Sequence, residues 1–323
     1  MNETPASTPR RRGTLADYVR IARPDHWIKN LFILPGFFAA DVLVGAGDNG
    51  RPWLKLIAAF VSTSLIASAN YAINEWLDAK FDRFHPTKKN RPVVVAEVRG
   101  SLVVAEWAVL AALGLAIAWP LGLTFFITAA WLLVMGIVYN VEPLRTKDIP
   151  FLDVLSESVN NMIRLLLGWF TVAAWLLPPC SLVLGYWMAG AFLMAAKRLA
   201  EFRMIGDKSL AGRYRKSFSR YSEVSLLVSS VVYAMLSTLL LGVFLVKHRI
   251  ELLLSMPPLV ALFADYLALV YRPDSAAQKP EKLYREKGLM LISAIFVVAL
   301  VIGCLVRMPW LGVFTTTDLV KLR

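Results

Sequence analysis

The stretch WLKLIAAFVSTSLIASANYAINEWLDAKFDRFHPTKKNRP, residues 53–92, changes character twice. It begins with a long, mostly apolar run, and a helix needs about 20 such residues to cross a bilayer. Asn74, Asp78 and Asp82 then follow at intervals of four, and a basic loop comes directly after them. The stretch therefore predicts a membrane-spanning helix with acids at its polar end, next to a cluster of bases.

Similar apolar runs recur through the whole chain. The 323 residues are 57% hydrophobic, with a mean hydropathy of +0.57, whereas an ordinary soluble domain has roughly 45–50% apolar residues. Nine runs are candidate membrane spans: 31–47, 53–75, 101–119, 121–140, 151–176, 180–199, 223–246, 251–271 and 288–307. We therefore expect an all-α polytopic membrane protein with about nine transmembrane helices and no soluble domain between them.

The basic residues are unevenly distributed between alternate connecting segments. With the N-terminus inside, the inside segments hold 27 of the 35 Lys and Arg residues, the outside segments hold seven, and Arg164 lies within a span. This positive-inside pattern predicts a cytosolic N-terminus and an outside C-terminus. It also explains the net charge of +12 without nucleic-acid binding, because no aromatic-rich soluble module accompanies the bases. We expect the chain in a bacterial inner (cell) membrane.

The N-terminal end of the chain and the two cysteines predict no further functional site. Residues 1–14, MNETPASTPRRRGT, predict a disordered basic arm, which leaves 15–323 as a single transmembrane domain. No small-residue cleavage site precedes the first apolar run near Leu31, so we expect no removable signal peptide. Cys180 and Cys304 lie in or beside apolar spans and imply neither a disulfide framework nor a zinc site.

The acids of the opening stretch predict a metal site. Residues four apart are neighbours on a helix face, so Asn74, Asp78 and Asp82 form one stripe whose oxygens repel each other unless a cation joins them. Mg²⁺ suits such a stripe, since it takes one or two carboxylates and completes its shell with water and substrate phosphates. Lys88 and Arg91 follow where phosphate oxygens would lie. The alternative is a polar helix end held by salt bridges.

A second polar stripe lies within the span 151–176. Asp153, Glu157, Asn160 and Arg164 are spaced i, i+4, i+7 and i+11, which places them on one helix face. Arg164 lies deep in the span and needs an anionic partner; an intrahelical pair with Asn160 and Glu157 is one possibility.

Further bases lie beside these stripes. Arg145 and Lys147 flank the entrance of the second polar helix, and Lys197 and Glu201 form an i, i+4 pair with Arg198 beside them. The third cluster could also be a helix end whose long side chains reach the membrane interface. Two acid stripes with basic loops at one membrane face predict a pocket for a metal and a diphosphate.

These motifs resemble a known family. NExxDxxxD (74–82) resembles the first aspartate-rich motif of the UbiA superfamily of intramembrane prenyltransferases, and DxxxE (153–157) resembles the second. Glu75 stands where the first motif usually has aspartate, and the second motif is closer to the general superfamily pattern. Several further stretches are similar to one branch, the decaprenyl-phosphate phosphoribosyltransferases: RPDHWIKN (23–30), HPTKKNRP (85–92), AKRLAEF (196–202), RKSFSRYS (215–222) and QKPEKLYREKG (278–288).

The resemblance implies an all-helical fold, a Mg²⁺ cofactor and transfer of a 5-phosphoribosyl group from phosphoribosyl diphosphate to a polyprenyl phosphate on the cytosolic side. The implied metal ligands are Asn74, Glu75, Asp78 and Asp82. The implied catalytic acids are Asp78, Asp82, Asp153 and Glu157. The candidate substrate-binding residues are Lys29, His85, Lys88, Arg91, Tyr139, Arg145, Lys197, Arg198 and Glu201.

Two other functions remain open on the sequence alone. A prenyltransferase would use the same metal site to ionise a prenyl diphosphate and would alkylate an aromatic or other lipid-soluble acceptor. The many bases favour the phosphoribosyl reaction, because its donor and acceptor together carry more phosphate groups. A transporter or assembly protein is the third possibility, but the charged stripes gather at one face and no clear internal repeat accompanies them.

Overall fold

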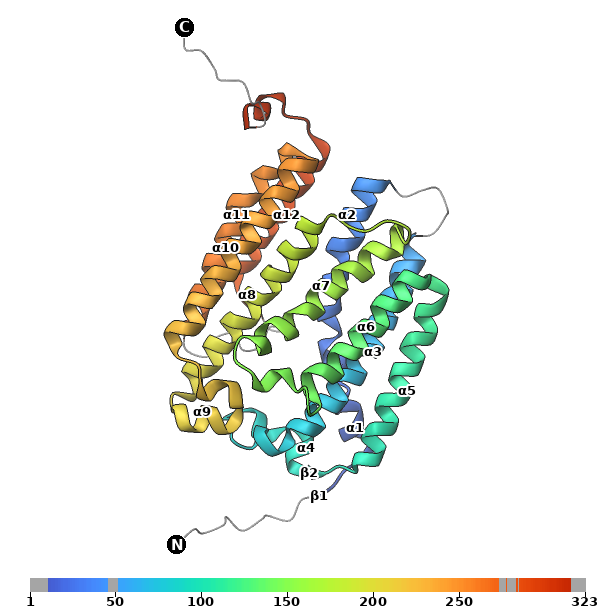
Figure 1. Cartoon of the computed structure of the whole chain (residues 1–323), viewed down its shortest axis with the longest axis vertical. Coiled ribbons are helices and arrows are strands. Elements are labelled where there is room, and N and C mark those ends of the chain that lie inside the picture. The colour runs from blue at the N-terminus through green and yellow to red at the C-terminus, as the bar shows by residue number, and fades with distance from the viewer. Residues whose placement is uncertain (1–10, 46–51, 273–276, 278–282, 284, 315–323) are drawn as a thin grey trace.

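The chain folds into a bundle of long helices (Figure 1). The computed structural model describes residues 11–45, 52–272, 277, 283 and 285–314, so residues 1–10 of the predicted arm and most of 278–288 lie outside the described residues. The α-helices are α1 (Leu15–Ile21), α2 (Leu34–Val44), α3 (Pro52–Asp82), α4 (Pro92–Val95), α5 (Gly100–Ala118), α6 (Leu123–Asn140), α7 (Leu152–Val172), α8 (Cys180–Ile205), α9 (Lys208–Tyr214), α10 (Glu223–His248), α11 (Met256–Val270) and α12 (Lys287–Leu305).

Short 3-10 helices and one small strand pair complete the described chain. The 3-10 helices are η1 (Pro24–Ile33), η2 (Lys88–Asn90), η3 (Trp119–Leu121), η4 (Thr146–Asp148), η5 (Lys216–Ser219), η6 (Ile250–Ser255) and η9 (Pro309–Phe314). The strands β1 (Arg11–Arg12) and β2 (Ala96–Glu97) pair in parallel, so the last residues of the predicted arm are joined to the loop before α5.

The predicted all-α membrane architecture is confirmed. Within the described residues, eight helical stretches are long and apolar enough to cross a bilayer: Leu15–Val44, Trp53–Asp82, Gly100–Leu121, Leu123–Asn140, Cys180–Ile205, Glu223–His248, Ile250–Val270 and Lys287–Leu305. They correspond to eight of the nine predicted spans. The remaining prediction, 151–176, corresponds to α7, which does not reach the apolar composition of the others because it carries the second polar stripe.

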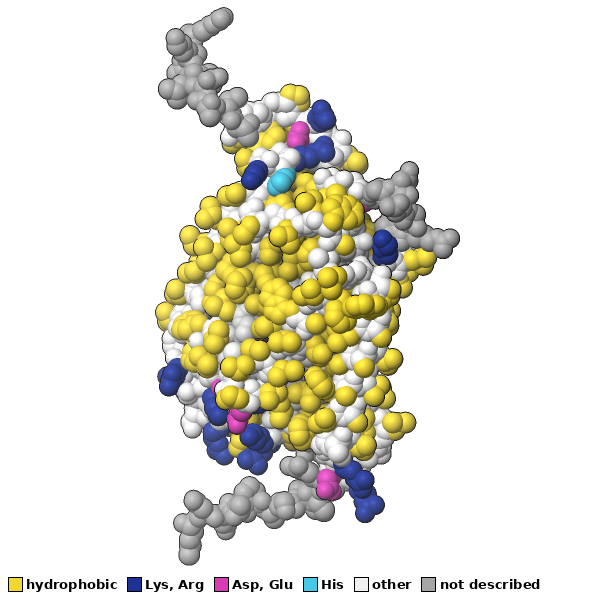
Figure 2. Space-filling model, turned by 45° about the vertical axis from the view of Figure 1, so that its right-hand side comes forward, with side chains coloured by type: hydrophobic (Ala, Val, Ile, Leu, Met, Phe, Trp, Pro, Cys, Tyr) yellow, Lys and Arg dark blue, Asp and Glu magenta, His cyan; other side chains and the backbone are white. Residues whose placement is uncertain are grey.

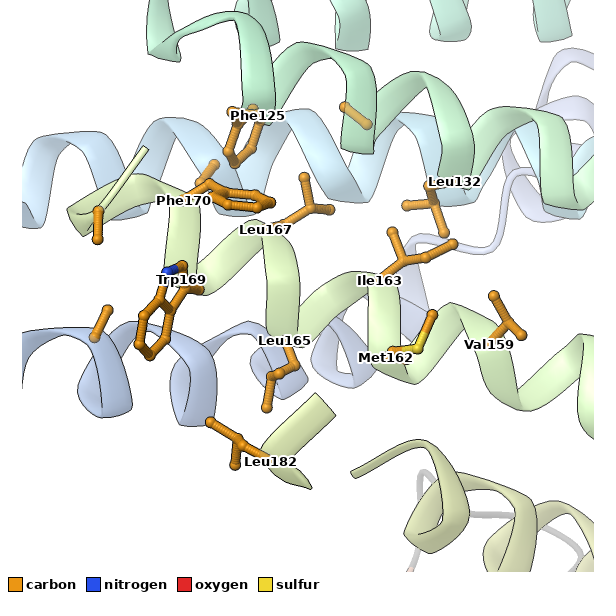
Figure 3. Close-up of a cluster of buried hydrophobic side chains, with 14 of the residues drawn as sticks. Phe125, Leu132, Val159, Met162, Ile163, Leu165, Leu167, Trp169, Phe170 and Leu182 are labelled. Carbon is orange, nitrogen blue, oxygen red and sulfur yellow. The ribbon is translucent and has the colours of Figure 1, made fainter. Parts of the chain in front are cut away.

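Helix α7 occupies the centre of the bundle, where it packs against α2, α6 and α8. Fourteen of its 21 residues are buried. In Figure 3, Phe125 of α6 lies against Phe170 of α7, while Leu182 of α8 lies on the other side of α7. A helix with a polar stripe can occupy this position because its neighbours, rather than lipid, surround it.

Two glycines allow α2 and α7 to approach backbone to backbone. A Cβ atom added to Gly36 would lie 1.9 Å from the carbonyl oxygen of Leu165, and one added to Gly168 would lie 1.9 Å from that of Ile33. Both neighbouring atoms are backbone atoms, so neither clash can be relieved by rotating a side chain. The close contact therefore requires glycine at both positions.

We expect Gly168→Ala to lower stability by about 1–3 kcal/mol, because α2 must move away from α7 to admit the methyl group. The measurement is thermal unfolding of the purified protein in detergent. Gly242→Ala on α10 is the matched control: its added Cβ meets no atom within 4 Å, and alanine is the better helix former. Equal melting temperatures for Gly168→Ala and Gly242→Ala would contradict the proposed close contact.

The surface separates into an apolar belt and charged ends. Figure 2 shows hydrophobic side chains over the middle of the molecule, with Lys and Arg gathered toward its two ends. Large apolar residues such as Val109, Leu239 and Val298 are more than half exposed, as expected of helix faces that contact lipid. Figure 1 shows α1, α4 and α9 together at one end of the bundle, and these helices belong to the segments that the basic residues predict to be cytosolic.

Candidate functional site

A strongly charged cavity of about 330 Å³ lies among η1, α3, α6, α7, α8 and the loops at the α9 end of the bundle. Three acids line it: Asp78, Asp82 and Glu157. Seven Lys and Arg residues also line it: Arg23, Lys29, Lys88, Arg91, Arg164, Lys197 and Arg215. Cations thus outnumber acids in a cavity that lies largely within the helical bundle.

The first polar stripe lines the cavity along α3. Asn74, Asp78 and Asp82 all contribute to its wall, as their spacing of four predicts for one helix face. The Asn74 amide donates a hydrogen bond to the side-chain oxygen of Asn140 on α6. Arg91 donates to Asp82 at 2.7 Å. The acids are therefore neighbours along the helix, and each is paired with bases from other segments.

Arg145 and Lys147 hold Asp78 from the loop between α6 and α7. Both donate to the same oxygen of Asp78, at 3.0 Å and 2.5 Å. Arg145 also donates to the Asn140 carbonyl at 2.8 Å. Its backbone has a φ of 25°, in the left-handed region that L residues rarely adopt, and such strain persists where surrounding contacts fix the conformation. Arg145 and Lys147 are thus firmly positioned next to the predicted metal ligands.

Glu75, the fourth predicted metal ligand on α3, does not line the cavity wall. Its side chain is buried and lines a neighbouring hollow together with Arg23 and Arg91. A helix turns by about 100° per residue, so Glu75 is rotated by about 100° from Asn74 but by only about 20° from Asp82, seven residues further on. Arg91 lines both this hollow and the cavity, and the role of Glu75 as a metal ligand stays a prediction.

The loop after α3 places its bases by means of His85. The His85 ring accepts hydrogen bonds at Nδ1 from the backbone amides of Thr87 and Lys88, both at 3.2 Å. Burial, reinforced by the charge of Lys88, lowers the pKa of His85 to about 3, so the ring is neutral at physiological pH. His85 is buried outside the cavity wall, and in this structure it shapes the loop.

The next residues of this loop separate into buried and exposed bases. Lys88 donates to Glu201 at 2.7 Å and also contacts the hydroxyl of Tyr214. Burial lowers the pKa of Lys88, although the carboxylate of Glu201 opposes this shift. Lys88 and Arg91 line the cavity, whereas Lys89 is exposed on the outside. In this register Lys88 and Arg91, the two bases expected beside phosphate oxygens, face the cavity and Lys89 does not.

The two acids of the second stripe have different surroundings. Glu157 lines the cavity and accepts a hydrogen bond from the Tyr139 hydroxyl at 2.8 Å. Asp153 is fully buried behind the wall, where it accepts from Tyr221 at 2.6 Å and from Ser217 at 3.2 Å. Helical spacing alone treats the two acids alike, but the segment from η5 to α10 covers Asp153. In this structure Asp153 supports the wall instead of forming it.

Arg198 connects the acids behind the cavity. Its side chain is only 1% exposed and donates to Asp153 at 3.2 Å, to Glu201 at 3.4 Å and to Glu157. It also donates to the Tyr139 hydroxyl at 3.0 Å. Its hydrogen-bonding groups are thus already engaged by protein. Lys197, the preceding residue, does line the cavity, with its amine 3.5 Å from Glu157.

Three of the Lys and Arg residues that line the cavity were not among the predicted substrate-binding residues. Arg215, in the loop between α9 and η5, donates to Tyr139 at 3.2 Å and lies 3.6 Å from Asp153. Arg23 and Arg164 also line the wall. The signal for Arg215 was present in the basic stretch RKSFSRYS, and that for Arg23 in RPDHWIKN, although neither stretch shows which of its bases points inward.

The donor set fits a metal that arrives together with a phosphate substrate. Among the residues that the structure describes, no group of three or more His, Cys, Asp and Glu side chains is gathered as a ready-made metal site. Asp78 and Asp82 nevertheless line one wall beside the Asn74 amide, and two carboxylates plus water and phosphate oxygens are what Mg²⁺ prefers. The bases now paired with these acids could then transfer to the phosphates.

Comparison with known proteins identifies the family. Residues 32–295 match the UbiA prenyltransferase family. The chain belongs to this family. The UbiA-family assignment covers both polar stripes and most of the helices, and it makes the protein a member of a family of transferases within the membrane.

Individual relatives extend the comparison. Decaprenyl-phosphate phosphoribosyltransferase of Mycolicibacterium smegmatis is 30% identical over 217 residues, which cover 65% of this chain and 64%, just under two thirds, of that protein. The Corynebacterium glutamicum protein of the same name is 26% identical over 304 residues, or 90% of this chain and 87% of that protein. A UbiA homolog from Archaeoglobus fulgidus, solved bound to GPP and Mg²⁺, is similar with a TM-score of 0.66 and 20% identity, covering 90% of this chain and 100% of that one. At this identity the likeness concerns the fold, and it confirms the expected UbiA-like bundle.

Proposed function

We propose that this UbiA-family protein transfers the 5-phosphoribosyl group of phosphoribosyl diphosphate to a polyprenyl phosphate. The observation that carries the proposal is the charge of the cavity, in which seven Lys and Arg side chains face three acids. Buried cations in a membrane protein are costly unless anions accompany them. The phosphoribosyl donor and the phosphate acceptor together present three phosphate-bearing positions. A prenyl diphosphate with a neutral acceptor presents one.

The similarity to named relatives supports the same donor. Two bacterial proteins that share 26–30% identity with this chain carry the name decaprenyl-phosphate phosphoribosyltransferase. The second of them is matched over nearly its whole length. Four bases of the stretches 23–30 and 85–92, which resemble the phosphoribosyltransferase branch, line the cavity: Arg23, Lys29, Lys88 and Arg91.

The chemistry requires little proton transfer. An oxygen of the acceptor phosphate attacks C1 of the ribose, the bond from C1 to the diphosphate oxygen breaks, and the diphosphate leaves with the bonding electrons. The acceptor phosphate is already anionic at neutral pH, so the site needs no strong base. Positioning and charge stabilisation then supply most of the rate enhancement.

The roles of the residues follow from their places in the cavity. Mg²⁺, when bound by Asp78, Asp82 and Asn74, would neutralise charge on the departing diphosphate. Lys88 and Arg91 lie beside these acids and would hold the diphosphate oxygens. Glu157 and Tyr139 lie further along α7 and α6, where they can orient the ribose. The apolar helix faces that meet the bilayer would carry the polyprenyl tail.

The orientation in the membrane is part of the proposal. The cavity is closest to the end of the bundle that carries α4, α9 and the loop 83–91, and the positive-inside pattern assigns this end to the cytosol. We therefore place the active site on the cytosolic side of a bacterial inner membrane. This side gives a soluble, polyanionic sugar donor access to the bases.

Prenyl transfer is the second candidate, since the same two acid stripes would serve a prenyl diphosphate and the A. fulgidus homolog was solved with GPP and Mg²⁺.

A direct comparison of substrates distinguishes phosphoribosyl transfer from prenyl transfer. Purified protein with Mg²⁺ is incubated with phosphoribosyl diphosphate and polyprenyl phosphate, or with a prenyl diphosphate and an aromatic acid. We expect diphosphate release and a phosphoribosylated lipid in the first mixture only. Release in the second mixture alone would overturn the proposal.

Substitutions in the loop after α3 test the donor site. Arg91→Ala should raise the apparent KM for phosphoribosyl diphosphate roughly 30-fold or more, because truncating one partner of a buried charge pair costs about 2–5 kcal/mol. Lys88→Ala should act in the same direction. Arg91→Lys should be tolerated poorly, since a planar guanidinium binds phosphate through two hydrogen bonds and an ammonium does not. The measurement is initial rate against donor concentration.

Lys89→Ala is the matched control for this loop, because Lys89 is exposed outside the cavity. We expect its kinetic constants to equal those of the unaltered protein. A large effect of Lys89→Ala, with Lys88→Ala and Arg91→Ala silent, would show that the loop contacts the donor in a different register.

A further inference from the structure

The cavity continues past the acids to a second polar region deeper in the bundle. Asp82 and Asn70 both line it on α3, and they are 12 residues apart, or roughly 18 Å along the helix axis. On α7, Glu157 and Arg164 line it seven residues apart, or roughly 10 Å. Asn160 lies between them on the same face. The cavity thus has a polar wall well below the predicted metal site.

Arg164 provides a cation at this deep end, and its partners among the described residues are neutral. Its Nε donates to the side-chain oxygen of Asn30 at 2.9 Å, and its Nη1 donates to the Asn160 carbonyl at 3.1 Å and the Asn161 side chain at 3.4 Å. The described residues supply neither a carboxylate for this guanidinium nor a hydrogen-bond acceptor for Nη2.

The intrahelical pair with Glu157 that the sequence allowed is absent among the described contacts. Glu157 is instead engaged by Lys197 at 3.5 Å and by Arg198, both from α8. Arg164 is only 7% exposed and lies within the bundle. A buried guanidinium without an anion is costly, so the geometry indicates a missing anionic partner.

Asn160 gives an independent sign of a missing ligand. Its side-chain oxygen is buried and has no hydrogen-bond partner among the described residues. Nearly all buried polar side-chain atoms have such a partner. A ligand that brings both an anion and hydroxyl groups would satisfy Arg164 and Asn160 together.

We infer that Arg164 forms a subsite for a phosphate monoester, and that this monoester is the 5-phosphate of the donor. The assignment rests on the proposed phosphoribosyl transfer. A sugar with phosphate groups at both ends can extend from the acids of α3 to Arg164, and its hydroxyls then pass Asn160. The planar guanidinium suits phosphate through paired hydrogen bonds. The acceptor phosphate is the other source of the same group, and the kinetic test separates the two.

Direct binding tests the subsite without any turnover. Calorimetry with purified protein in detergent and ribose 5-phosphate as the probe should give measurable binding. Arg164→Gln should weaken it roughly 30-fold or more. Arg203→Gln is the matched control, since Arg203 lies on the outside of α8 and pairs with Glu223. Equal affinity in the unaltered protein and Arg164→Gln would overturn the inference.

Asn30→Asp separates a binding role from a structural one. The new carboxylate would lie at the position that now accepts from Arg164 Nε at 2.9 Å, so it would supply the missing anion from within the protein. We expect a melting temperature equal to or above that of the unaltered protein, together with loss of ribose 5-phosphate binding. Retained binding in Asn30→Asp would contradict the subsite, whatever the stability of Arg164→Gln.

Kinetics identify the source of the phosphate. Arg164→Gln should raise KM for phosphoribosyl diphosphate and leave KM for polyprenyl phosphate unchanged. The unaltered protein should prefer phosphoribosyl diphosphate to ribosyl 1-diphosphate, which lacks the 5-phosphate, and Arg164→Gln should remove this preference. A raised KM for polyprenyl phosphate alone would overturn the donor assignment. If the unaltered protein binds ribose 5-phosphate but turns over only prenyl diphosphate, the proposed function fails while the phosphate subsite stands.

Discussion

Arg198→Met should destabilise the protein far more than the loss of any surface ion pair. The methionine cannot replace the hydrogen bonds to Asp153, Glu157 and Glu201, and two of these acids are 2% exposed or less. Removing one partner from a buried ion pair costs roughly 3–5 kcal/mol. We therefore expect either no folded protein or a melting temperature far below that of the unaltered protein in the same detergent.

Arg203→Met provides the comparison for Arg198. Arg203 belongs to the same helix, but its salt bridge with Glu223 lies at the surface, where such pairs contribute about 1 kcal/mol or less. Its melting temperature should change little. If Arg198→Met unfolds at the same temperature as Arg203→Met, Arg198 does not hold the acids together, and a direct role toward a phosphate becomes the better explanation.

Asp82→Asn should reduce turnover by at least about 100-fold, because a ligand charge is lost from the predicted Mg²⁺ site. The substitution also removes the negative charge that pairs with Arg91, which now donates to Asp82 at 2.7 Å. The donor's KM should therefore change little, and the loss should appear in kcat and in a higher Mg²⁺ concentration for half-maximal activity. The measurement is a Mg²⁺ titration at saturating donor.

Two further variants test whether the effect of Asp82→Asn is specific to the predicted metal site. Glu97→Gln removes an exposed acid at the same end of the bundle and should leave the Mg²⁺ titration unchanged. Asp78→Asn should lose both turnover and stability, because Arg145 and Lys147 would remain buried without the negative charge that they share. Full activity of the unaltered protein in excess EDTA would refute a metal-dependent reaction.

Several features of the protein could be predicted from the sequence because they depend on neighbouring residues. Apolar runs of bilayer length gave the membrane architecture, since hydrophobic length is a local property. Spacing by four placed Asn74, Asp78 and Asp82 on one face of α3, because a helix repeats every 3.6 residues. The concentration of Lys and Arg in alternate connecting segments predicts a cytosolic N-terminus, and this orientation in the membrane stays a prediction. The span 151–176 was correctly expected to be helical, although its polar stripe makes it less apolar than the other long helices.

Tertiary structure decided which charges meet. Lys88 pairs with Glu201 across 113 residues of sequence, and Arg198 engages Asp153 across 45. Helical periodicity carries no information about contacts between helices, so it could not show that Asp153 would be covered while Glu157 lines the cavity. The same limit applies to Arg164: its own helix offered Glu157 as a partner, but α8 brings Lys197 and Arg198 to that carboxylate first. The sequence thus determined the helices and their polar faces, whereas the packing of α7 against α8 decided which acids and bases face the cavity.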